Sequence, residues 1–420
     1  MKKIKNDILN KIFNKDARNI LDFLGKSISI NSTITSPPYF DMKDYGSDNQ
    51  IGYGQSYQEY LNDLKDIFEK IFQITEKDGS LWIIIDTFKR ENQVVTLPFD
   101  LSNKLKEIGW LLQDIIIWKK DKTVPWSNNG FVQRKFEYIL FFAKSEKFKY
   151  NKDKVRNFDV NQLKKWWVKY PERYNPRGKA LDEIWEFPIP VQGSWGDKYI
   201  RHFCPLPKEM VATIIEISSN EEDIILDPFA GSGSVPFQSA SMNRKYIGFE
   251  LNTTYIEMFD DYLKKNLEQS KKDYLLLQKI TDQEEFRKRI LNLRSLKYGR
   301  ILINEIEKKF ELDLKIFVKI KEYINDSKTH INVEYQIIGD ISNKKKFLIN
   351  EINDLTSKPP LSKFGINPVF KFLKNKEFNS KKYYNYTNTN TYSYSDLPST
   401  SSKIKVISEI CVDFNENDYN

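Results

Sequence analysis

The stretch DIILDPFAGSGSV (residues 223–235) joins an apolar run to a glycine loop, and it decides the fold. The run ends at Asp227, and Gly231 and Gly233 follow in a short loop that leads into an expected helix. Glycines at the carboxyl end of a strand let the backbone approach a ligand closely. Glu250 ends the next expected strand, 23 residues after Asp227. An acid about 20 residues after such a loop typically meets ribose hydroxyls, so this unit predicts a nucleoside site.

The kind of nucleoside follows from what the loop lacks. A phosphate-binding P-loop needs a Lys after its glycines, and none follows here. A dinucleotide fingerprint needs a third glycine where Pro236 stands, and it leaves the helix start free for pyrophosphate. An acid beside the loop instead suits a positively charged nucleoside without phosphate. S-adenosylmethionine (AdoMet) is such a molecule, and we expect it as the cofactor.

Strand-like and helix-like stretches alternate around this unit. Strands are expected over residues 27–35, 80–88, 110–120, 136–145, 223–229 and 245–251, and helices over residues 56–75, 97–109, 206–219 and 233–243. This alternation predicts an α/β domain with a mainly parallel sheet. A basic, aromatic segment between residues 145 and 200 interrupts it. From about residue 265 the chain becomes highly charged, and we expect a mainly helical C-terminal module there.

The first of these strands ends in an unusual turn, ITSPPYF (residues 34–40). Each proline fixes φ, lacks an N–H donor and holds its predecessor in extended geometry. Ser36, Pro37 and Pro38 therefore form a stiff, non-helical stretch with unpaired carbonyl groups, and this stretch ends at the Tyr39 ring. A Pro-Pro pair on its own usually indicates a rigid turn, so its meaning depends on the rest of the chain.

Composition excludes several classes of protein. The chain has 420 residues, of which 40% are apolar, enough for a sizeable core and two or three domains. No apolar run reaches the length of about 18 residues that a membrane span needs, and the N-terminus lacks the apolar stretch of a signal peptide. Two cysteines and two histidines cannot make a disulfide framework and nearly exclude a zinc site or a His-based triad. We therefore expect a cytoplasmic protein with no metal site and no membrane contact.

Positive charge is concentrated in one segment. The net charge is +8, and residues 144–179 alone hold 12 basic and 4 acidic residues, so the rest of the chain sums to about zero. Aromatic side chains such as Trp166 and Trp167 are interleaved with the cations. Phosphates and bases need different partners, and cations and rings supply them. We expect this segment to bind nucleic acid, and its candidate contacts are Lys164, Lys165, Arg173, Arg177 and Lys179.

Taken together, these motifs resemble those of a known family. TSPPYF (35–40) and DPFAGSGS (227–234) resemble the signatures of the DNA methyltransferases that methylate exocyclic amines. The catalytic motif comes first, which resembles the β group of that family. RHFCPLPKEMV (201–211) and NKDARNIL (14–21) resemble further elements beside the cofactor. The resemblance covers about residues 10–260 and implies an AdoMet-dependent enzyme that flips a base out of duplex DNA.

The resemblance also implies an architecture and a set of site residues. The implied fold is a Rossmann-like AdoMet-dependent methyltransferase sheet with a catalytic half (1–145), a target-recognition segment (146–200), a cofactor-binding half (201–264) and a C-terminal module (265–420). The implied catalytic residues are Ser36, Pro37, Pro38 and Tyr39. The implied cofactor residues are Asp16, Thr35, Phe203, Pro205, Asp227, Pro228, Phe229, Gly231, Ser232, Gly233, Glu250, Leu251 and Asn252. Two departures are Ser234 in place of the usual Thr and the stretch IIIDTF (83–88), which leaves the roles of Asp86 and Thr87 open.

The expected reaction is site-specific methylation of duplex DNA, as in a restriction-modification system with a cognate restriction endonuclease. In the resembled family, Ser at the first motif position goes mainly with N4 of cytosine and Asp with N6 of adenine. Ser36 therefore favours cytosine, with adenine as the alternative. Enzymes that act on RNA or on a glutamine amide usually carry NPPY instead. An inactive DNA-binding relative and a fused restriction enzyme, with acid-x-Lys triplets such as Glu307-Lys308-Lys309, are further alternatives.

Overall fold

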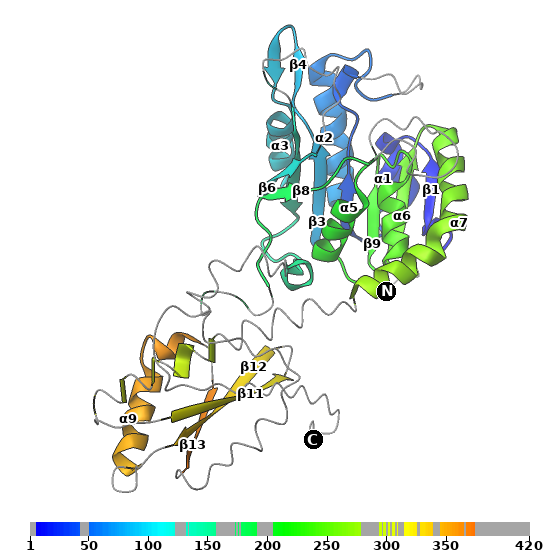
Figure 1. Cartoon of the computed structure of the whole chain (residues 1–420). Coiled ribbons are helices and arrows are strands. Elements are labelled where there is room, and N and C mark those ends of the chain that lie inside the picture. Colours follow the sequence, from blue (N-terminus) through cyan, green and yellow to red (C-terminus); the bar gives the residue numbers. More distant parts are fainter. Residues whose placement is uncertain are drawn as a thin grey trace. The chain divides into compact units, whose positions relative to one another are not determined.

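The chain divides into two compact units in its computed structural model (Figure 1). The structure describes residues 6–42, 50–121, 134–156, 178–190 and 205–278, single residues 132, 173 and 175, and parts of 294–373. The first unit comprises Met1–Arg156 and Ala180–Ile280, and the second comprises Asn157–Lys179 and Thr281–Asn420. Both motif blocks of the sequence therefore lie in the first unit.

An eight-stranded sheet forms the centre of the first unit, in the order β1-β10-β9-β2-β3-β7-β6-β8. Its strands are β1 (Lys11–Asn14), β2 (Ile30–Thr35), β3 (Thr75–Ile85), β6 (Leu111–Lys119), β7 (Phe136–Ala143), β8 (Ile184–Glu186), β9 (Ile224–Asp227) and β10 (Lys245–Glu250). The run from β1 to β3 in this order is parallel throughout, β7 is antiparallel to β3 and β6, and β8 is parallel to β6. The mainly parallel, Rossmann-like α/β sheet that the sequence predicts is confirmed.

Helices cover both faces of this sheet (Figure 1). One set consists of α1 (Ile20–Leu24), α2 (Tyr57–Ile74) and α3 (Leu97–Ile108), and the other of α5 (Lys208–Ser218), α6 (Ser234–Ser241) and α7 (Thr253–Gln278). Successive residues of a strand point to opposite faces, and β3 follows this rule. Leu81, Ile83 and Ile85 pack with the first set, whereas Trp82 and Ile84 pack with α5 on the other face.

The helix α2 illustrates how local sequence sets these elements. Ser56 accepts a hydrogen bond from the Glu59 N–H at 3.3 Å, and the Glu59 carboxylate accepts one from the Ser56 N–H at 2.8 Å. This reciprocal capping box satisfies two backbone donors that a helix start leaves free. Its buried side chains recur at helical spacing, and they include Tyr60, Leu64 and Ile71.

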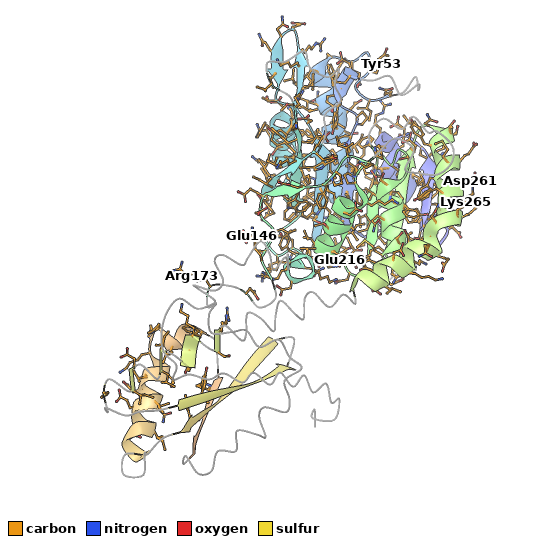
Figure 2. The ribbon with its side chains drawn as sticks, viewed as in Figure 1. Tyr53, Glu146, Arg173, Glu216, Asp261 and Lys265 are labelled. Atoms are coloured by element: carbon orange, nitrogen blue, oxygen red, sulfur yellow. The ribbon has the colours of Figure 1, made fainter. Side chains whose placement is uncertain are left out.

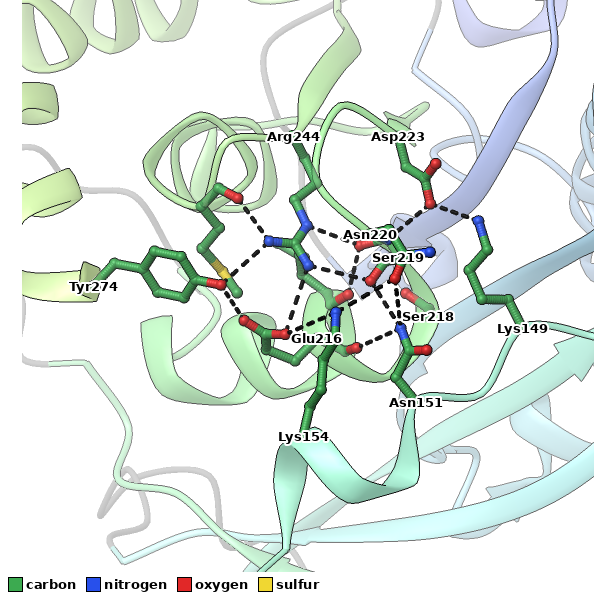
Figure 3. Close-up of polar contacts among 12 residues, drawn as sticks. Lys149, Asn151, Lys154, Glu216, Ser218, Ser219, Asn220, Asp223, Arg244 and Tyr274 are labelled. Atoms are coloured by element: carbon green, nitrogen blue, oxygen red, sulfur yellow. Dashed lines mark hydrogen bonds and ion pairs between the residues drawn. The ribbon is translucent and has the colours of Figure 1, made fainter. Parts of the chain in front are cut away.

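Charged side chains form a network at the amino ends of the parallel strands (Figure 3). Arg244, only 2% exposed, precedes β10 and lies 3.6 Å from a carboxylate oxygen of Glu216 on α5. Its guanidinium also donates to the carbonyl oxygens of Met242 at 2.7 Å and Ser219 at 3.1 Å. The Tyr274 hydroxyl on α7 donates to Glu216. The network therefore ties α5, α7 and the start of β10 together.

The same network holds the chain that follows β7. Lys149 Nζ lies 2.6 Å from Asp223 Oδ2, and Lys154 Nζ lies 3.7 Å from Glu216 Oε2 (Figure 3). Residues up to Arg156 belong to the first unit, and β8 adds an edge strand to its sheet. Within the expected target-recognition segment, 146–200, the structure thus places residues 146–156 and the strand β8 with the methyltransferase sheet.

The described part of the second unit contains a three-stranded sheet, and this corrects the expectation of a mainly helical module. β11 (Lys315–Asn325) pairs antiparallel with β12 (Lys328–Ile338), which pairs parallel with β13 (Asn367–Leu373). The helix α9 (Lys345–Ser357) accompanies them. In the sequence KIFVKIKEYIN, apolar residues recur at about every second position, which is the period of a strand. The many charged residues in between led to the prediction of a helical module instead. In the part of the chain that the structure describes, each helix is too short or too polar to cross a bilayer.

Candidate active site

The parallel strands bring the expected site residues to one edge of the sheet. At this edge, β2 ends at Thr35, β9 at Asp227 and β10 at Glu250. Because β7 runs antiparallel to β3, its first residues lie at the same edge. Ligands of open α/β sheets bind outside the carboxyl ends of the strands. This edge is therefore the candidate site.

One hydrogen bond joins the two motifs across 192 positions of sequence: Thr35 Oγ1 donates to Asp227 Oδ1 at 2.7 Å. The Phe229 N–H donates to the same oxygen at 3.1 Å. Thr35 and Asp227 are buried, at 0% and 4% exposed. They meet because β2 and β9 are neighbouring parallel strands. The Ser36-Pro37-Pro38 turn therefore begins directly beside the glycine loop.

Burial controls the ionisation of the two acids at this edge. Desolvation raises the pKa of Asp227 from 3.8 to about 7, although two hydrogen bonds lower it. Desolvation also raises the pKa of Glu250, against the effect of backbone N–H donors. Among the described residues, neither carboxylate forms an ion pair with a Lys or Arg. A positively charged ligand would therefore favour the ionised forms of both acids.

Glu250 holds the glycine loop in place from β10. Its Oε2 accepts the Gly231 N–H at 2.8 Å, and its Oε1 accepts the Asn252 N–H at 2.8 Å. Asn14, at the end of β1, donates through Nδ2 to the Leu251 carbonyl at 2.7 Å. The carboxylate and the loop thus form one preorganised unit, in which Glu250 faces the backbone of the loop.

The end of the glycine loop leaves no room for a side chain. Gly233 has φ +84°, and a Cβ there would lie 2.1 Å from Cδ2 of the buried Phe259. Only glycine adopts this conformation without strain. The neighbouring Ser232 is 8% exposed, and its Oγ has no hydrogen-bond partner among the described residues. A buried hydroxyl without a partner is costly unless a ligand engages it.

These observations fit the cofactor that the sequence predicts. AdoMet carries a positive charge and ribose hydroxyls, and the edge offers two acids without a cationic partner and one unpaired buried hydroxyl. Asp227, Glu250 and Ser232 are the residues that would hold it. Among the described residues, no group of three or more His, Cys, Asp or Glu could hold a metal ion.

The catalytic turn is fixed by its neighbours and leaves two acceptors open. The Pro38 carbonyl accepts the Tyr60 hydroxyl at 2.7 Å and the Phe40 N–H at 3.1 Å. Phe40 has φ +51° and is buried, with its ring stacked on Phe88 at a centroid distance of 5.8 Å. Among the described residues, no hydrogen bond is made to Ser36 Oγ or to the Pro37 carbonyl. Those two acceptors belong to a turn whose next carbonyl, that of Pro38, is engaged twice.

Two acids beside this turn were not identified as site residues from the sequence. Glu137, near the start of β7, accepts the Tyr39 hydroxyl at 2.9 Å. Asp86, just after β3, lies 3.1 Å from the Arg134 guanidinium. Desolvation raises the pKa of Asp86 to about 6, although Arg134 opposes it. The stretch IIIDTF drew attention to Asp86 without a role. The stretch RKFEYILFFAKS (134–145) resembles the same family and contains Glu137, but it gave that acid no role.

Asp16, which the sequence predicts to contact the cofactor, binds Arg18 in this structure. It follows β1 and caps the short helix Ala17–Asn19 by accepting the Arg18 N–H at 2.8 Å. Its carboxylate also forms an ion pair with Arg18 at 2.7 Å. Arg18 reaches Asp63 of α2 at 3.4 Å. In this structure Asp16 therefore organises the chain after β1, and its contact with AdoMet is a proposal.

The remaining expected site residues lie in different parts of the chain. Pro228 and Leu251 directly follow Asp227 and Glu250 at the site edge, and Pro205 precedes α5. Phe203, Lys164, Lys165 and Arg177 lie outside the described residues. Arg173, labelled in Figure 2, and Lys179 belong to the second unit.

Comparison with known proteins places this site in a family. The family model described as "DNA methylase", for N6- and N4-directed methyltransferases, matches residues 30–261. The type II methyltransferase M.Cfr9I of Citrobacter freundii is 28% identical over 277 residues, which cover 59% of this chain and 85% of that protein. The type II methyltransferase M.XycI of Xanthomonas campestris pv. cyanopsidis is 28% identical and covers 60% and 87%.

A solved structure is similar as well. The PvuII DNA methyltransferase (cytosine-N4-specific) is 18% identical, covers 67% of this chain and 92% of its own, and has a TM-score of 0.46. The family match spans more than half of the chain and includes both motifs and the strands that carry them. The chain therefore belongs to the N6/N4 family of DNA methylases, the AdoMet-dependent DNA methyltransferases that its two motifs predict.

Proposed function

We propose that the chain transfers a methyl group from AdoMet to N4 of cytosine in a specific duplex DNA sequence. The observation that carries this proposal is the hydrogen bond from Thr35 to Asp227. It puts the catalytic turn next to the acids that would bind the cofactor, so that donor and acceptor of the methyl group can meet. N6 of adenine is the alternative target within the same family.

The proposed cofactor contacts use the charge and the close packing of the edge. Asp227 and Glu250 would face the positive charge and the ribose hydroxyls, and Ser232 would find its missing partner there. Phe229, Gly231 and the other expected residues of the loop would supply backbone and ring contacts. When bound, AdoMet supplies a methyl group on a positively charged sulfur.

The catalytic turn would act on the amine of the target base. The lone pair of an exocyclic amine is delocalised into the ring, so the amine must become more tetrahedral before it can attack. Ser36 Oγ and the Pro37 carbonyl can accept its two N–H bonds, and they favour that geometry more in the transition state than in the ground state. The Tyr39 ring would stack on the flipped base and offset part of the cost of extrusion. The methylated amine can then release its proton to water or to Ser36.

Cytosine is proposed over adenine because Ser, not Asp, begins the catalytic motif. Type II methyltransferases among the relatives support a role in restriction and modification, with a cognate restriction endonuclease as the proposed partner. DNA from cells that express the chain would be digested to nucleosides and analysed by mass spectrometry. We expect N4-methylcytosine. N6-methyladenine as the only product would contradict the cytosine assignment, and no methylated base would contradict the enzyme class.

The turn itself is tested by Ser36→Ala. Turnover should fall about tenfold to a thousandfold, which is the range for one lost transition-state contact. AdoMet affinity, measured by calorimetry, should stay the same. Ser145→Ala is the matched control, because Ser145 follows the far end of β7 and its hydroxyl donates to the Lys147 carbonyl at 3.1 Å. Equal turnover of the two variants would remove Ser36 from the proposed mechanism.

DNA recognition is proposed for the basic segment and for five of its cations, Lys164, Lys165, Arg173, Arg177 and Lys179. Charge reversal at Lys164, Lys165 and Arg177 together should weaken DNA binding and reduce its dependence on salt, because fewer phosphates are neutralised. AdoMet affinity should not change. An unchanged salt slope would show that the phosphate-binding surface lies elsewhere.

A further inference from the structure

The residues before and after Tyr39 in the chain are both held in place. On one side the Pro38 carbonyl accepts the Tyr60 hydroxyl at 2.7 Å. On the other side Phe40 is buried at 1% exposed and packs against Tyr57, Tyr60 and Phe88. The backbone of Tyr39 therefore has little freedom, while its side chain is half-buried at the edge of the site.

Glu137 holds the far end of the same ring. It is 8% exposed, and its two carboxylate oxygens have different partners. Oε2 accepts the Tyr39 hydroxyl at 2.9 Å, and Oε1 forms an ion pair with Lys120. A hydrogen bond to an ionised acceptor is stronger than one between neutral groups. Lys120 thus holds one oxygen of the carboxylate whose other oxygen binds Tyr39.

The two charged residues stand on rigid elements. Glu137 is paired with Trp118 in the β6–β7 ladder, and Lys120 follows β6 directly, with its Nζ 5.0 Å from the centre of the Trp118 ring. Trp118 is itself buried at 4% exposed. Side chains on strands hold a functional group more accurately than side chains on loops. The acceptor for Tyr39 therefore has a fixed position before any DNA is bound.

We propose that Glu137, held in place by its ion pair with Lys120, is a positioning residue that fixes the Tyr39 ring to receive the flipped base. This inference rests on the proposed function. A ring that is free to rotate loses conformational freedom when a base stacks on it, and that loss weakens binding. The bond to Glu137 orders the ring in the free protein, so the base meets a surface that is already in place.

The test is a double-mutant cycle on a duplex that carries the mapped methylation site. Tyr39→Phe removes the hydrogen bond and keeps the ring and the Glu137–Lys120 pair. Glu137→Ala removes the acceptor, and Glu137→Gln restores a neutral one. We expect kcat/KM for DNA to fall about tenfold in Tyr39→Phe and in Glu137→Ala, and to recover in part in Glu137→Gln. The double variant Tyr39→Phe/Glu137→Ala should be no worse than either single variant.

Two further measurements separate positioning from a general loss of structure. The AdoMet dissociation constant, measured by calorimetry without DNA, should be unchanged in every variant. Glu186→Ala is the matched control, because Glu186 pairs with Lys119 at 2.7 Å on the neighbouring strand β8 and is 68% exposed. It should leave kcat/KM unchanged.

The outcomes are distinct. Losses that multiply in the double variant would overturn the inference, as would full activity of Tyr39→Phe while the wild type methylates the duplex. Weakened AdoMet binding in Glu137→Ala and Tyr39→Phe would also overturn it, because the ring would then act on the cofactor side. A wild-type chain that methylates no DNA would instead contradict the proposed function, and the inference would fall with it.

Discussion

Each edge of the central sheet holds buried or half-buried acids, but the partners of these acids differ between the two edges. At the amino edge, Glu216 is surrounded by Arg244, Lys154 and the Tyr274 hydroxyl (Figure 3). At the carboxyl edge, Asp227 and Glu250 accept only from a hydroxyl and backbone N–H groups among the described residues. A buried acid with a cation beside it stabilises the fold once formed. A buried acid without one holds negative charge that a cationic ligand can use.

Both acids of the carboxyl edge have raised pKa values. Desolvation without a cation nearby raises the pKa of Asp227 to about 7 and raises that of Glu250. Perturbed acids of this kind gather at functional sites. We therefore propose that the amino edge serves stability and the carboxyl edge serves binding, and each role can be tested by the quantity it should change.

The largest expected effect is on stability, from Arg244→Leu at the amino edge. The substitution leaves Glu216, whose side chain is 15% exposed, without its most buried partner. Removing one member of a buried ion pair costs about 3 kcal/mol of the free energy of unfolding. Chemical denaturation would measure the loss, and AdoMet affinity of the folded fraction should stay the same. A loss below about 1 kcal/mol would mean that this edge does not carry the stability assigned to it.

A matched pair of substitutions compares the edges directly. Glu250→Gln keeps a side-chain oxygen but removes the charge, and we expect AdoMet affinity to fall about tenfold to a hundredfold. Gln can still accept one of the two N–H groups that Glu250 accepts, from Gly231 or from Asn252. No cation among the described residues loses its partner, so the free energy of unfolding should fall less than in Glu216→Gln. Glu216→Gln should do the opposite and lower stability without affecting AdoMet. If both variants lose stability alone, Glu250 is a structural acid like Glu216.

The sequence could predict both the sheet and most of the carboxyl edge, because those signals are local. The helix expected over 56–75 is α2 (Tyr57–Ile74), since its capping box and its apolar spacing lie within its own sequence. The meeting of Thr35 with Asp227 follows once β2 and β9 are neighbours. The contact between Tyr39 and Glu137 could not be predicted, because the two residues are 98 positions apart and meet only if β7 is antiparallel.

The structure also differs from the sequence analysis where local signals were weak or misleading. The strand β1 has four residues, KIFN, too few for a recognisable alternation. The basic segment looked uniform, yet Lys149 and Lys154 at its start are paired with acids at the amino edge. Charge composition alone cannot distinguish a cation that pairs within the chain from one that is available to DNA.

A third effect concerns pH at the carboxyl edge. Because the pKa of Asp227 is raised to about 7, the folded chain holds its proton more tightly than the unfolded chain does. The contribution of Asp227 to stability therefore falls as pH rises from about 4 to about 7. AdoMet affinity should move the other way and rise about tenfold between pH 6 and pH 8, since the ionised acid attracts the cation.

Calorimetry across this pH range, with and without Asp227→Asn, would measure both trends. The variant keeps an oxygen that can accept from Thr35 and Phe229, so the chain should still fold. Its affinity should be weaker, and its dependence on pH should be flatter. A wild-type affinity that is constant from pH 6 to pH 8 would show that Asp227 is ionised throughout or does not face the cofactor.

The smallest effect on stability is expected from Lys154→Ala. A small effect would show that this cation pairs within the chain and does not bind DNA. Lys154 belongs to the basic segment by sequence, but its ammonium group lies 3.7 Å from Glu216 and its side chain is 43% exposed. An exposed ion pair of this kind contributes about 0–1 kcal/mol and is weakened by salt. We therefore expect a stability loss below about 1 kcal/mol and no change in DNA affinity or in its salt slope. If Lys154→Ala weakened DNA binding as much as charge reversal at Lys164, Lys165 and Arg177, the amino edge would be part of the DNA surface, and the division between a structural edge and a binding edge would be wrong.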